Sequence, residues 1–233
     1  IKAYGKKVAS FSKNLSGYVF CAKSPSCGME RVKVYSPTGD PLQAKGIGVF
    51  SREIMKANPL LPCEENGRLN DPIIRENFVA RVYAYRHWQA LVESGISKHK
   101  LTSFHAQYKY TVMSHNLVAY KELGRLLARA DLPLQEMAEQ YISGLMAALT
   151  IKATRKNHSN TLSHIQGYFS KYLNKEQRKE LSEQVDAYRN GLVPLMVPLT
   201  LVNHYLLAHP NDYLAQQAYL NPYPESLKLR YGY

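Results

Sequence analysis

The sequence predicts an α/β fragment followed by an all-α helical domain, so that the chain as a whole is predominantly helical. Two observations support this prediction. Short apolar runs alternate with helix-period segments over roughly the first 70 residues, as they do in α/β folds. From Lys100 onward, apolar residues recur at helical spacing almost throughout. We expect three regions: an α/β fragment at residues 1–75, a connecting helix at 76–97 and the helical domain at 98–233.

The α/β fragment contains two predicted helices and two predicted strands. Helical spacing of apolar residues predicts helices at residues 3–15 and 46–58. The apolar run at residues 18–22 predicts a buried strand. Residues 31–35 alternate polar and apolar side chains, which predicts a half-buried strand, and the turn-forming residues 36–41 follow it.

A long helix is predicted over residues 71–94. Asp71 is a suitable N-cap, and Pro72 suits the first helical position because its missing N–H has no partner there. Gly95 follows the last apolar residues and ends the helix. The apolar positions that recur at helical spacing are Ile74, Phe78, Val82, Tyr85 and Trp88.

The remaining chain predicts seven helices and an extended C-terminal tail of ten residues, rich in Pro and Tyr, packed on the helical body. The helices are expected at residues 101–114, 116–130, 134–153, 159–172, 175–190, 192–208 and 211–219.

The chain is strongly basic, with 30 Lys and Arg against 18 Asp and Glu and a formal net charge of +12. The excess gathers in two runs, residues 98–129 and 152–179, and each run contains a single carboxylate. A solvated face explains one such run, whereas two in one domain favour nucleic acid as the partner.

The sequence also indicates the compartment. No apolar run approaches the ~20 residues that span a bilayer, and residues 1–7 are charged, without the apolar core of a signal peptide. The three cysteines include no CxxC pair and match no zinc spacing. We therefore expect a cytoplasmic protein without a membrane partner. Because the chain does not start with Met, we also expect it to begin inside a longer protein.

One loop joins chemically useful groups. Residues 23–28 (KSPSCG) follow the strand predicted at 18–22 and place Ser24 close to Cys27. Pro25 restricts the backbone, and Gly28 is expected to adopt a conformation closed to other residues. A thiol on such a loop is a metal ligand or nucleophile, or else a small residue in a turn.

Two sets of motifs resemble known families. Residues 23–35 (KSPSCGMERVKVY), followed by 67–72 (GRLNDP) and 75–78 (RENF), resemble the C-terminal half of the thiouracil desulfidase (TudS) family. A second set resembles the YbgA-type helical domain, and together the two resemble the fused tRNA thiouridine desulfidases (RudS). The second set comprises Phe104-His105, Lys109-Tyr110, Met113-Ser114-His115, Tyr120, Leu123-Gly124, Asn160, His164 to Phe169, Tyr188, Gly191, Pro194, Pro198 and His204-Tyr205.

The resemblance implies an iron–sulfur chemistry. In that family three cysteines hold a [4Fe-4S] cluster, and its open iron binds the sulfur of a thiolated pyrimidine, which water then replaces. Cys27 would be one cluster ligand and Ser24 a catalytic hydroxyl. The family's other two ligand cysteines and its acid/base glutamate lie upstream and are absent here. Cys21 and Cys63 match no ligand position, so we expect this chain alone to bind no cluster.

For the helical domain, the resemblance implies binding of the tRNA substrate. The expected tRNA-binding residues are Lys109, Arg125, Arg155, Lys156, His105 and His164. Some of the 18 tyrosines could stack on a splayed base, and we name Tyr108, Tyr110 and Tyr168. Three roles stay open for the histidines, namely packing in the core, phosphate contact and metal binding. This set is His105, His115, His158, His164 and His204.

Two other functions remain alternatives. The chain could be a non-catalytic RNA- or protein-binding module that retains a vestigial desulfidase segment. It could also belong to a desulfidase of free thiouracil, in which the helical domain serves assembly.

Overall fold

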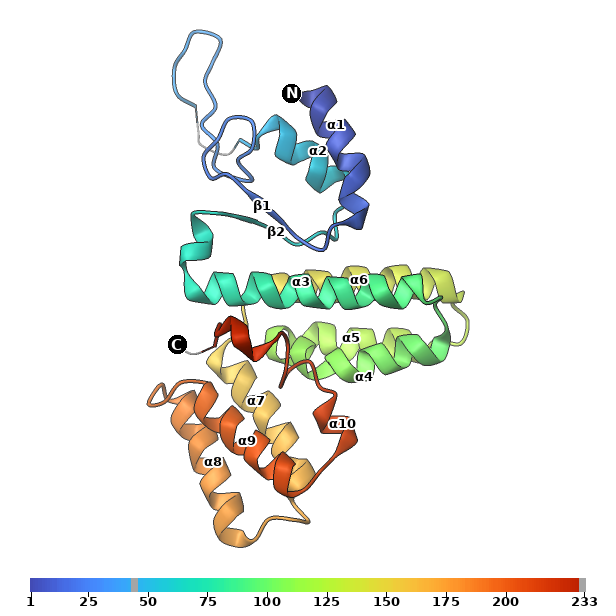
Figure 1. Cartoon of the computed structure of the whole chain (residues 1–233), viewed down its shortest axis with the longest axis vertical. Coiled ribbons are helices and arrows are strands. Elements are labelled where there is room, and N and C mark those ends of the chain that lie inside the picture. Colours follow the sequence, from blue (N-terminus) through green and yellow to red (C-terminus); the bar gives the residue numbers. More distant parts are fainter. Residues whose placement is uncertain (43–45, 231–233) are drawn as a thin grey trace. The chain divides into compact units, whose positions relative to one another are not determined.

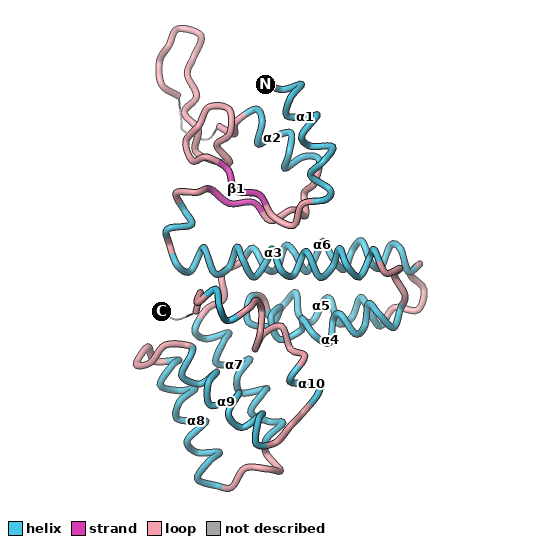
Figure 2. Tube along the Cα trace, in the orientation of Figure 1, coloured by secondary structure: helices cyan, strands magenta, loops and turns pink. Residues whose placement is uncertain are grey.

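The computed structural model describes residues 1–42 and 46–230, and the chain divides into two compact units, Ile1–Arg86 and His87–Tyr233 (Figure 1). The chain is 63% helical, and the described residues contain ten α-helices and one two-stranded sheet (Figure 2). The predicted, predominantly helical fold is therefore confirmed.

The first unit pairs a small parallel sheet with two helices. Strand β1 (Tyr18–Phe20) lies beside β2 (Cys63–Glu65), with Phe20 opposite Glu65. Helix α1 (Lys2–Phe11) packs against α2 (Val49–Ala57). A side chain at Gly5 would be crowded by α2, because its Cβ would lie 3.3 Å from the Glu53 Cβ. Short 3-10 turns follow α1 at Ser12–Asn14 and β2 at Arg68–Asn70.

The strand predicted at residues 31–35 is wrong. Val32 and Tyr35 form only isolated antiparallel bridges, to Gly46 and Pro41. Val32 is buried, but Val34 is 40% exposed and Tyr35 is 56% exposed, so the alternating pattern does not place a continuous face of the segment in the core. Cys21, expected inside the first strand, directly follows β1 and is exposed.

Helix α3 (Pro72–Glu93) confirms the long helix predicted at 71–94. The Asp71 carboxylate Oδ1 caps it, accepting from the backbone N–H groups of Ile73 at 2.8 Å and Ile74 at 3.1 Å. Beyond its C-terminus, Gly95 has a φ of +81°, which suits glycine. The boundary between the two units falls within this helix.

The second unit confirms each of the seven helices predicted after residue 100, with shifted ends. They are α4 (Lys98–His115), α5 (Leu117–Ala128), α6 (Leu134–Thr150), α7 (Arg155–Gln166), α8 (Lys175–Arg189), α9 (Met196–Ala208) and α10 (Asp212–Ala215). A 3-10 turn (Gly167–Phe169) follows α7. The core of α7–α10 includes Leu162, Leu181, Val202 and Leu214.

The C-terminal segment is irregular apart from a 3-10 turn at Glu225–Leu227. Arg230 attaches it to the body, since its Nη1 donates to the Tyr219 carbonyl at 3.0 Å. Residues 231–233 of the predicted tail lie outside the described residues. Among the helices of the described chain, none combines the length and apolarity needed to cross a bilayer.

Candidate functional site

The loop after β1 holds Cys27 in a chain of hydrogen bonds. The Cys27 backbone N–H donates to Ser24 Oγ at 3.2 Å, and Ser24 Oγ lies 3.2 Å from Ser26 Oγ. Ser26 Oγ lies 3.4 Å from the Cys27 sulfur, and the Gly28 N–H donates to the Ser24 carbonyl at 2.8 Å. The structure thus brings together the two residues predicted for the desulfidase site, Ser24 and Cys27, and adds a second hydroxyl.

Gly28 in this loop and Gly48 at the start of α2 are required for space. Gly28 was expected to adopt a backbone conformation closed to other residues, and this expectation is wrong. The positive φ angle in the loop belongs to Lys23 (φ 61°) and not to Gly28. A Cβ on Gly28 would instead lie 2.5 Å from Val32 Cγ2. A Cβ on Gly48, at the start of α2, would lie 2.8 Å from the Cys27 backbone nitrogen. The loop and the first turn of α2 therefore pack backbone to backbone.

Backbone hydrogen bonds attach the Cys27 loop to α2. The Gly48 N–H donates to the Gly28 carbonyl at 2.8 Å, and the Phe50 N–H donates to the Ser26 carbonyl at 2.9 Å. Groups at the N-terminus of a helix need such partners, because no carbonyl of the helix itself reaches them. The loop conformation is thus determined by α2.

A buried carboxylate anchors the other side of the loop. Glu65 of β2 is 4% exposed, and its Oε1 accepts from the backbone N–H groups of Met29 at 2.8 Å and Glu30 at 3.3 Å. Its neighbour Glu64 accepts from Arg68 Nε at 2.7 Å, and Arg68 Nη1 donates to Glu30 at 2.9 Å. Sequence reasoning missed this network. The sequence does contain a sign of this network, namely two glutamates that directly follow a cysteine in an otherwise apolar stretch.

The three cysteines have different environments. Cys27 is half-buried, Cys21 is exposed and Cys63 is buried. Burial raises the pKa of the Cys63 thiol to about 12, although the nearby Arg81 guanidinium opposes the shift. Cys63 is therefore a neutral packing thiol at neutral pH. Within residues 1–42 and 46–230, no three His, Cys, Asp or Glu side chains are grouped as metal ligands.

In the second unit, Lys109 lies among tyrosines. Its ammonium nitrogen is 5.1 Å from the Tyr110 ring centre and 4.9 Å from that of Tyr213. Tyr110 donates to the Tyr168 hydroxyl at 3.2 Å, and the Tyr168 and Tyr213 rings stack at 5.6 Å. Partial burial lowers the pKa of Lys109, but the nearby phenols, with Tyr213 first and then Tyr168 and Tyr120, give a net increase. Lys109 is therefore a charged cation in an aromatic surrounding, the Lys109–tyrosine cluster.

Tyr108 and Tyr110, two of the tyrosines proposed to stack on a base, are unsuitable. Tyr108 is 3% exposed and stacks on Phe104 at 4.6 Å, while Tyr110 is 4% exposed. Tyr168 is 36% exposed and keeps a face open to a ligand. The sequence alone could not separate these tyrosines, because their burial depends on the helices that cover them.

The predicted tRNA-binding residues fall into two groups. His105 is half-buried one turn before Lys109, and burial, with a contribution from Lys109, lowers its pKa to about 4. Arg155 has a structural role, because its Nη1 donates to the Tyr188 carbonyl at 3.0 Å and its guanidinium lies 5.0 Å from the Tyr188 ring centre. Arg125, Lys156 and His164 are exposed, as Arg155 also is.

The histidines for which metal binding was one open role have separate environments. His158 is hydrogen-bonded to the Tyr219 hydroxyl at 3.0 Å, and burial is the main cause that lowers its pKa to about 3. His115 Nδ1 contacts the Ile151 carbonyl, and His204 is exposed on α9. These environments support the core and surface interpretations of the histidines.

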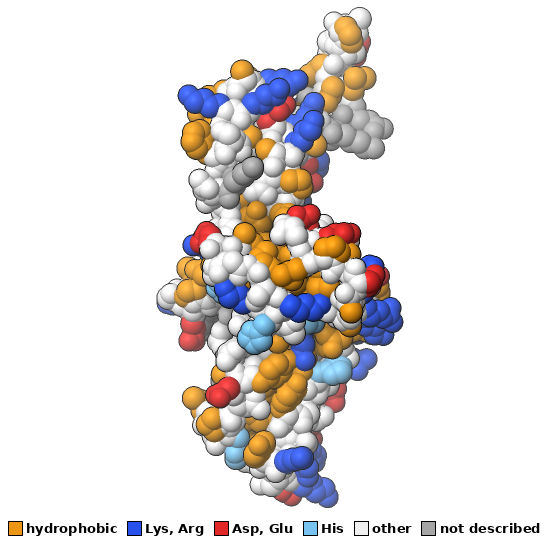
Figure 3. Space-filling view, turned by 90° about the vertical axis from the view of Figure 1, so that its right-hand side faces the viewer, with side chains coloured by type: hydrophobic (Ala, Val, Ile, Leu, Met, Phe, Trp, Pro, Cys, Tyr) orange, Lys and Arg blue, Asp and Glu red, His pale blue; other side chains and the backbone are white. Residues whose placement is uncertain are grey.

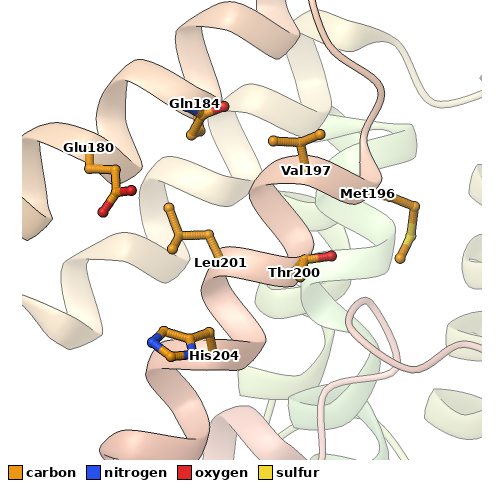
Figure 4. A pocket seen from close by; sticks show the side chains of 7 residues that line it. All are labelled: Glu180, Gln184, Met196, Val197, Thr200, Leu201 and His204. Atoms are coloured by element: carbon orange, nitrogen blue, oxygen red, sulfur yellow. The ribbon is translucent and has the colours of Figure 1, made fainter.

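A groove of about 550 Å³ lies between α8 and α9 (Figure 4). Its lining includes the Glu180 carboxylate, which accepts from the Tyr205 hydroxyl at 3.1 Å, and the imidazole of His204. The carboxylate makes this groove unsuitable for a phosphate. In Figure 3, Lys and Arg side chains are scattered over the visible face with carboxylates between them, so the basic charge forms no single continuous patch there.

The two units match different protein families. Residues 1–66 match the model of the 2-thiouracil desulfurase family, and residues 109–224 match a family described as protein of unknown function (DUF1722). Over 159 residues the chain is 29% identical to the uncharacterized protein YbgA of Escherichia coli (strain K12). These residues make up 67% of this chain and 94% of that relative. No solved structure matches the chain. The chain therefore carries a segment similar to the 2-thiouracil desulfurase family, followed by a helical domain similar to the DUF1722 family.

Proposed function

We propose that this chain is part of an iron–sulfur-dependent desulfidase that removes sulfur from thiouridine in tRNA, and that its helical unit binds the tRNA. The observation that carries the proposal is the position of Cys27. It lies in the segment that matches the desulfurase family, on a loop attached to α2 and β2, beside two hydroxyls. A tRNA substrate also implies a cytoplasmic location.

The residues of this chain do not by themselves fit an iron–sulfur cluster. Such a cluster requires several thiolates, and the described residues contain no three-residue group of metal-binding type. Cys63 is buried with a raised pKa, and Cys21 is exposed directly after β1. We therefore propose that Cys27 supplies one ligand and that two further thiolates come from polypeptide outside these 233 residues.

Ser24 is suited to hold a proton next to the reacting group. Its Oγ accepts the Cys27 N–H, so its own O–H is available to Ser26 or to a bound thiocarbonyl. A serine positioned in this way can hydrogen-bond the substrate or relay a proton to a leaving sulfur.

In the helical unit, the Lys109–tyrosine cluster suits an RNA strand. The described residues place no carboxylate in an ion pair with Lys109, so its charge is available to a phosphate. The partly exposed Tyr168 offers a ring for base stacking. Arg125, Lys156 and His164 add exposed groups that could contact the RNA backbone.

Substitution of Cys27 in the intact protein, reconstituted without oxygen, tests the desulfidase assignment. Cys27→Ala should abolish both the visible absorbance of the cluster and sulfur release from thiolated tRNA. Cys21→Ala is the matched control, since that thiol is exposed and outside the loop. A Cys27→Ala protein that keeps both signals would falsify the assignment.

The choice of substrate separates the remaining functions. Sulfur release from thiolated tRNA but not from free thiouracil supports the proposal, whereas the reverse identifies a free-base desulfidase. Binding of tRNA without any sulfur release identifies a non-catalytic module. Affinity for tRNA should also fall steeply with salt, because phosphate contacts release counterions.

A further inference from the structure

Helix α9 and the C-terminal segment line a small, partly open cavity of about 210 Å³ in the second unit. Leu199 and Leu220, which are 2% and 6% exposed, contribute its apolar walls. Tyr223 adds an aromatic side chain to the same lining. The volume is below the 300–1,000 Å³ typical of pockets for drug-sized ligands. A ligand that fills this cavity is therefore about the size of a single ring.

Two polar side chains on one face of α9 line the cavity. Thr200 and Asn203 are three residues apart, so they lie on the same face of the helix. The Asn203 side chain is half-buried, and its amide has no hydrogen-bond partner within residues 1–42 and 46–230. An amide offers both an N–H donor and a C=O acceptor, and a ligand that displaces solvent from this half-buried amide must replace its hydrogen bonds. The ligand should thus present an acceptor next to a donor.

The charges around the cavity exclude an anion. Arg230 and Glu225 both contribute to the lining, so a guanidinium and a carboxylate offset each other. The Arg230 guanidinium lies 5.9 Å from the Tyr223 ring centre, and its Nη1 is bound to the Tyr219 carbonyl. A phosphate inside the cavity would be close to Glu225. The ligand that fits is uncharged, planar and polar at its edge.

We propose that this cavity binds one unstacked nucleobase of an RNA, with the Asn203 amide pairing with the edge of the base. Asparagine is well suited to this task, since its side chain can make two parallel hydrogen bonds to a base edge. The proposal rests on the RNA binding proposed above. It adds a second point of recognition, separate from the Cys27 loop, that would hold a nucleotide other than the one that reacts.

The test uses the complete chain and simple probes. Uridine, cytidine, adenosine and guanosine 5′-monophosphates are titrated separately, and ribose 5-phosphate serves as the probe without a base. Binding is followed by the NMR signals of the asparagine side-chain amides. We expect at least one nucleotide to shift the Asn203 amide signal, while ribose 5-phosphate leaves it unchanged. Equal shifts with ribose 5-phosphate, or no shift with any nucleotide, would overturn the base pocket.

Variants extend the test to RNA. Asn203→Leu and the nearly isosteric Asn203→Asp should each weaken tRNA binding by about tenfold, because a bidentate base contact contributes roughly 1–3 kcal/mol. Asn160→Leu, on the exposed surface of α7, is the matched control and should bind as the parent does. Thermal melts establish that each variant is folded.

The outcomes distinguish the two proposals. If the chain binds tRNA and both Asn203 variants bind equally well, the base pocket is wrong and the proposed function stands. If the chain does not bind tRNA but a nucleotide still shifts the Asn203 signal, RNA binding is wrong, and the cavity is a site for free nucleotides rather than for a base of RNA.

Discussion

The Glu65 carboxylate on β2 accepts a 2.8 Å hydrogen bond from the backbone N–H of Met29, two residues after Cys27. The parallel pairing of β1 and β2 places this carboxylate beside the loop that follows β1. Because Glu65 is almost fully buried, loss of its carboxylate leaves backbone N–H groups without an acceptor. The position of Cys27 therefore depends on a residue 38 positions away in the sequence.

Replacement of Glu65 should loosen the Cys27 loop. Glu65→Ala is expected to lower the free energy of unfolding by about 1–3 kcal/mol and to increase the rate at which the Cys27 thiol reacts with Ellman's reagent. Glu65→Gln retains a carbonyl acceptor and should recover much of both effects. The measurements are urea denaturation and thiol kinetics, in a Cys21→Ser background that removes the exposed thiol. Unchanged thiol kinetics in Glu65→Ala would show that the carboxylate does not position the loop.

Glycine substitutions should have opposite effects at two positions. Gly48→Ala brings a Cβ against the Ser26 carbonyl and within 2.8 Å of the Cys27 nitrogen, so it should destabilise the first unit by more than about 1 kcal/mol. Gly124→Ala places its Cβ in open space within α5 and should stabilise by about 0.5–1 kcal/mol. Chemical denaturation of both variants tests this pair. A Gly48→Ala protein as stable as Gly124→Ala would contradict the close packing of the loop on α2.

The buried His158 should make stability depend on pH. Its pKa is lowered by burial to about 3, whereas the unfolded chain should titrate near 6.5. The unfolded state therefore binds more protons between these values, and stability from this residue is present above about pH 6.5 and is lost as the pH falls toward 3. The expected slope is about 1.4 kcal/mol per pH unit.

Denaturation curves measured from pH 7 to pH 4 test this prediction for His158. His158→Gln should flatten the dependence, and His204→Gln, at an exposed position, should not. Equal slopes for His158→Gln and the parent chain would exclude His158 as the cause.

Loss of the Lys109 charge should weaken tRNA binding. Lys109→Met is expected to lower affinity and to reduce the slope of log K against log salt by about 1, as removal of one phosphate contact does. Lys109→Arg keeps the charge and should retain most of the slope. Fluorescence anisotropy over a range of KCl concentrations measures both quantities. Lys6→Met, on the exposed surface of α1, is the control, and an equal loss there would indicate only a net-charge effect.

Local signals account for what could be predicted of the fold. Asp71, Pro72 and Gly95 mark the ends of α3 because capping and φ preferences involve residues a few positions apart. The seven later helices follow in the same way from spacing of 3.6 residues. The alternation at residues 31–35 failed as a predictor because a strand needs a paired neighbour and a face to bury, and this segment has only two isolated bridges.

The sequence by itself determined the helical fold, the order of the two family segments and the pairing of Ser24 with Cys27 in one loop. The tertiary structure alone decided that Glu65 and α2 hold this loop, that Tyr108 is buried while Tyr168 is exposed, and that Asn203 lines a cavity. The physical reason is the range of the interactions. Hydrogen bonds and rotamers within a few residues can be inferred from neighbours, whereas burial and polar partners depend on segments that approach only when the chain is folded.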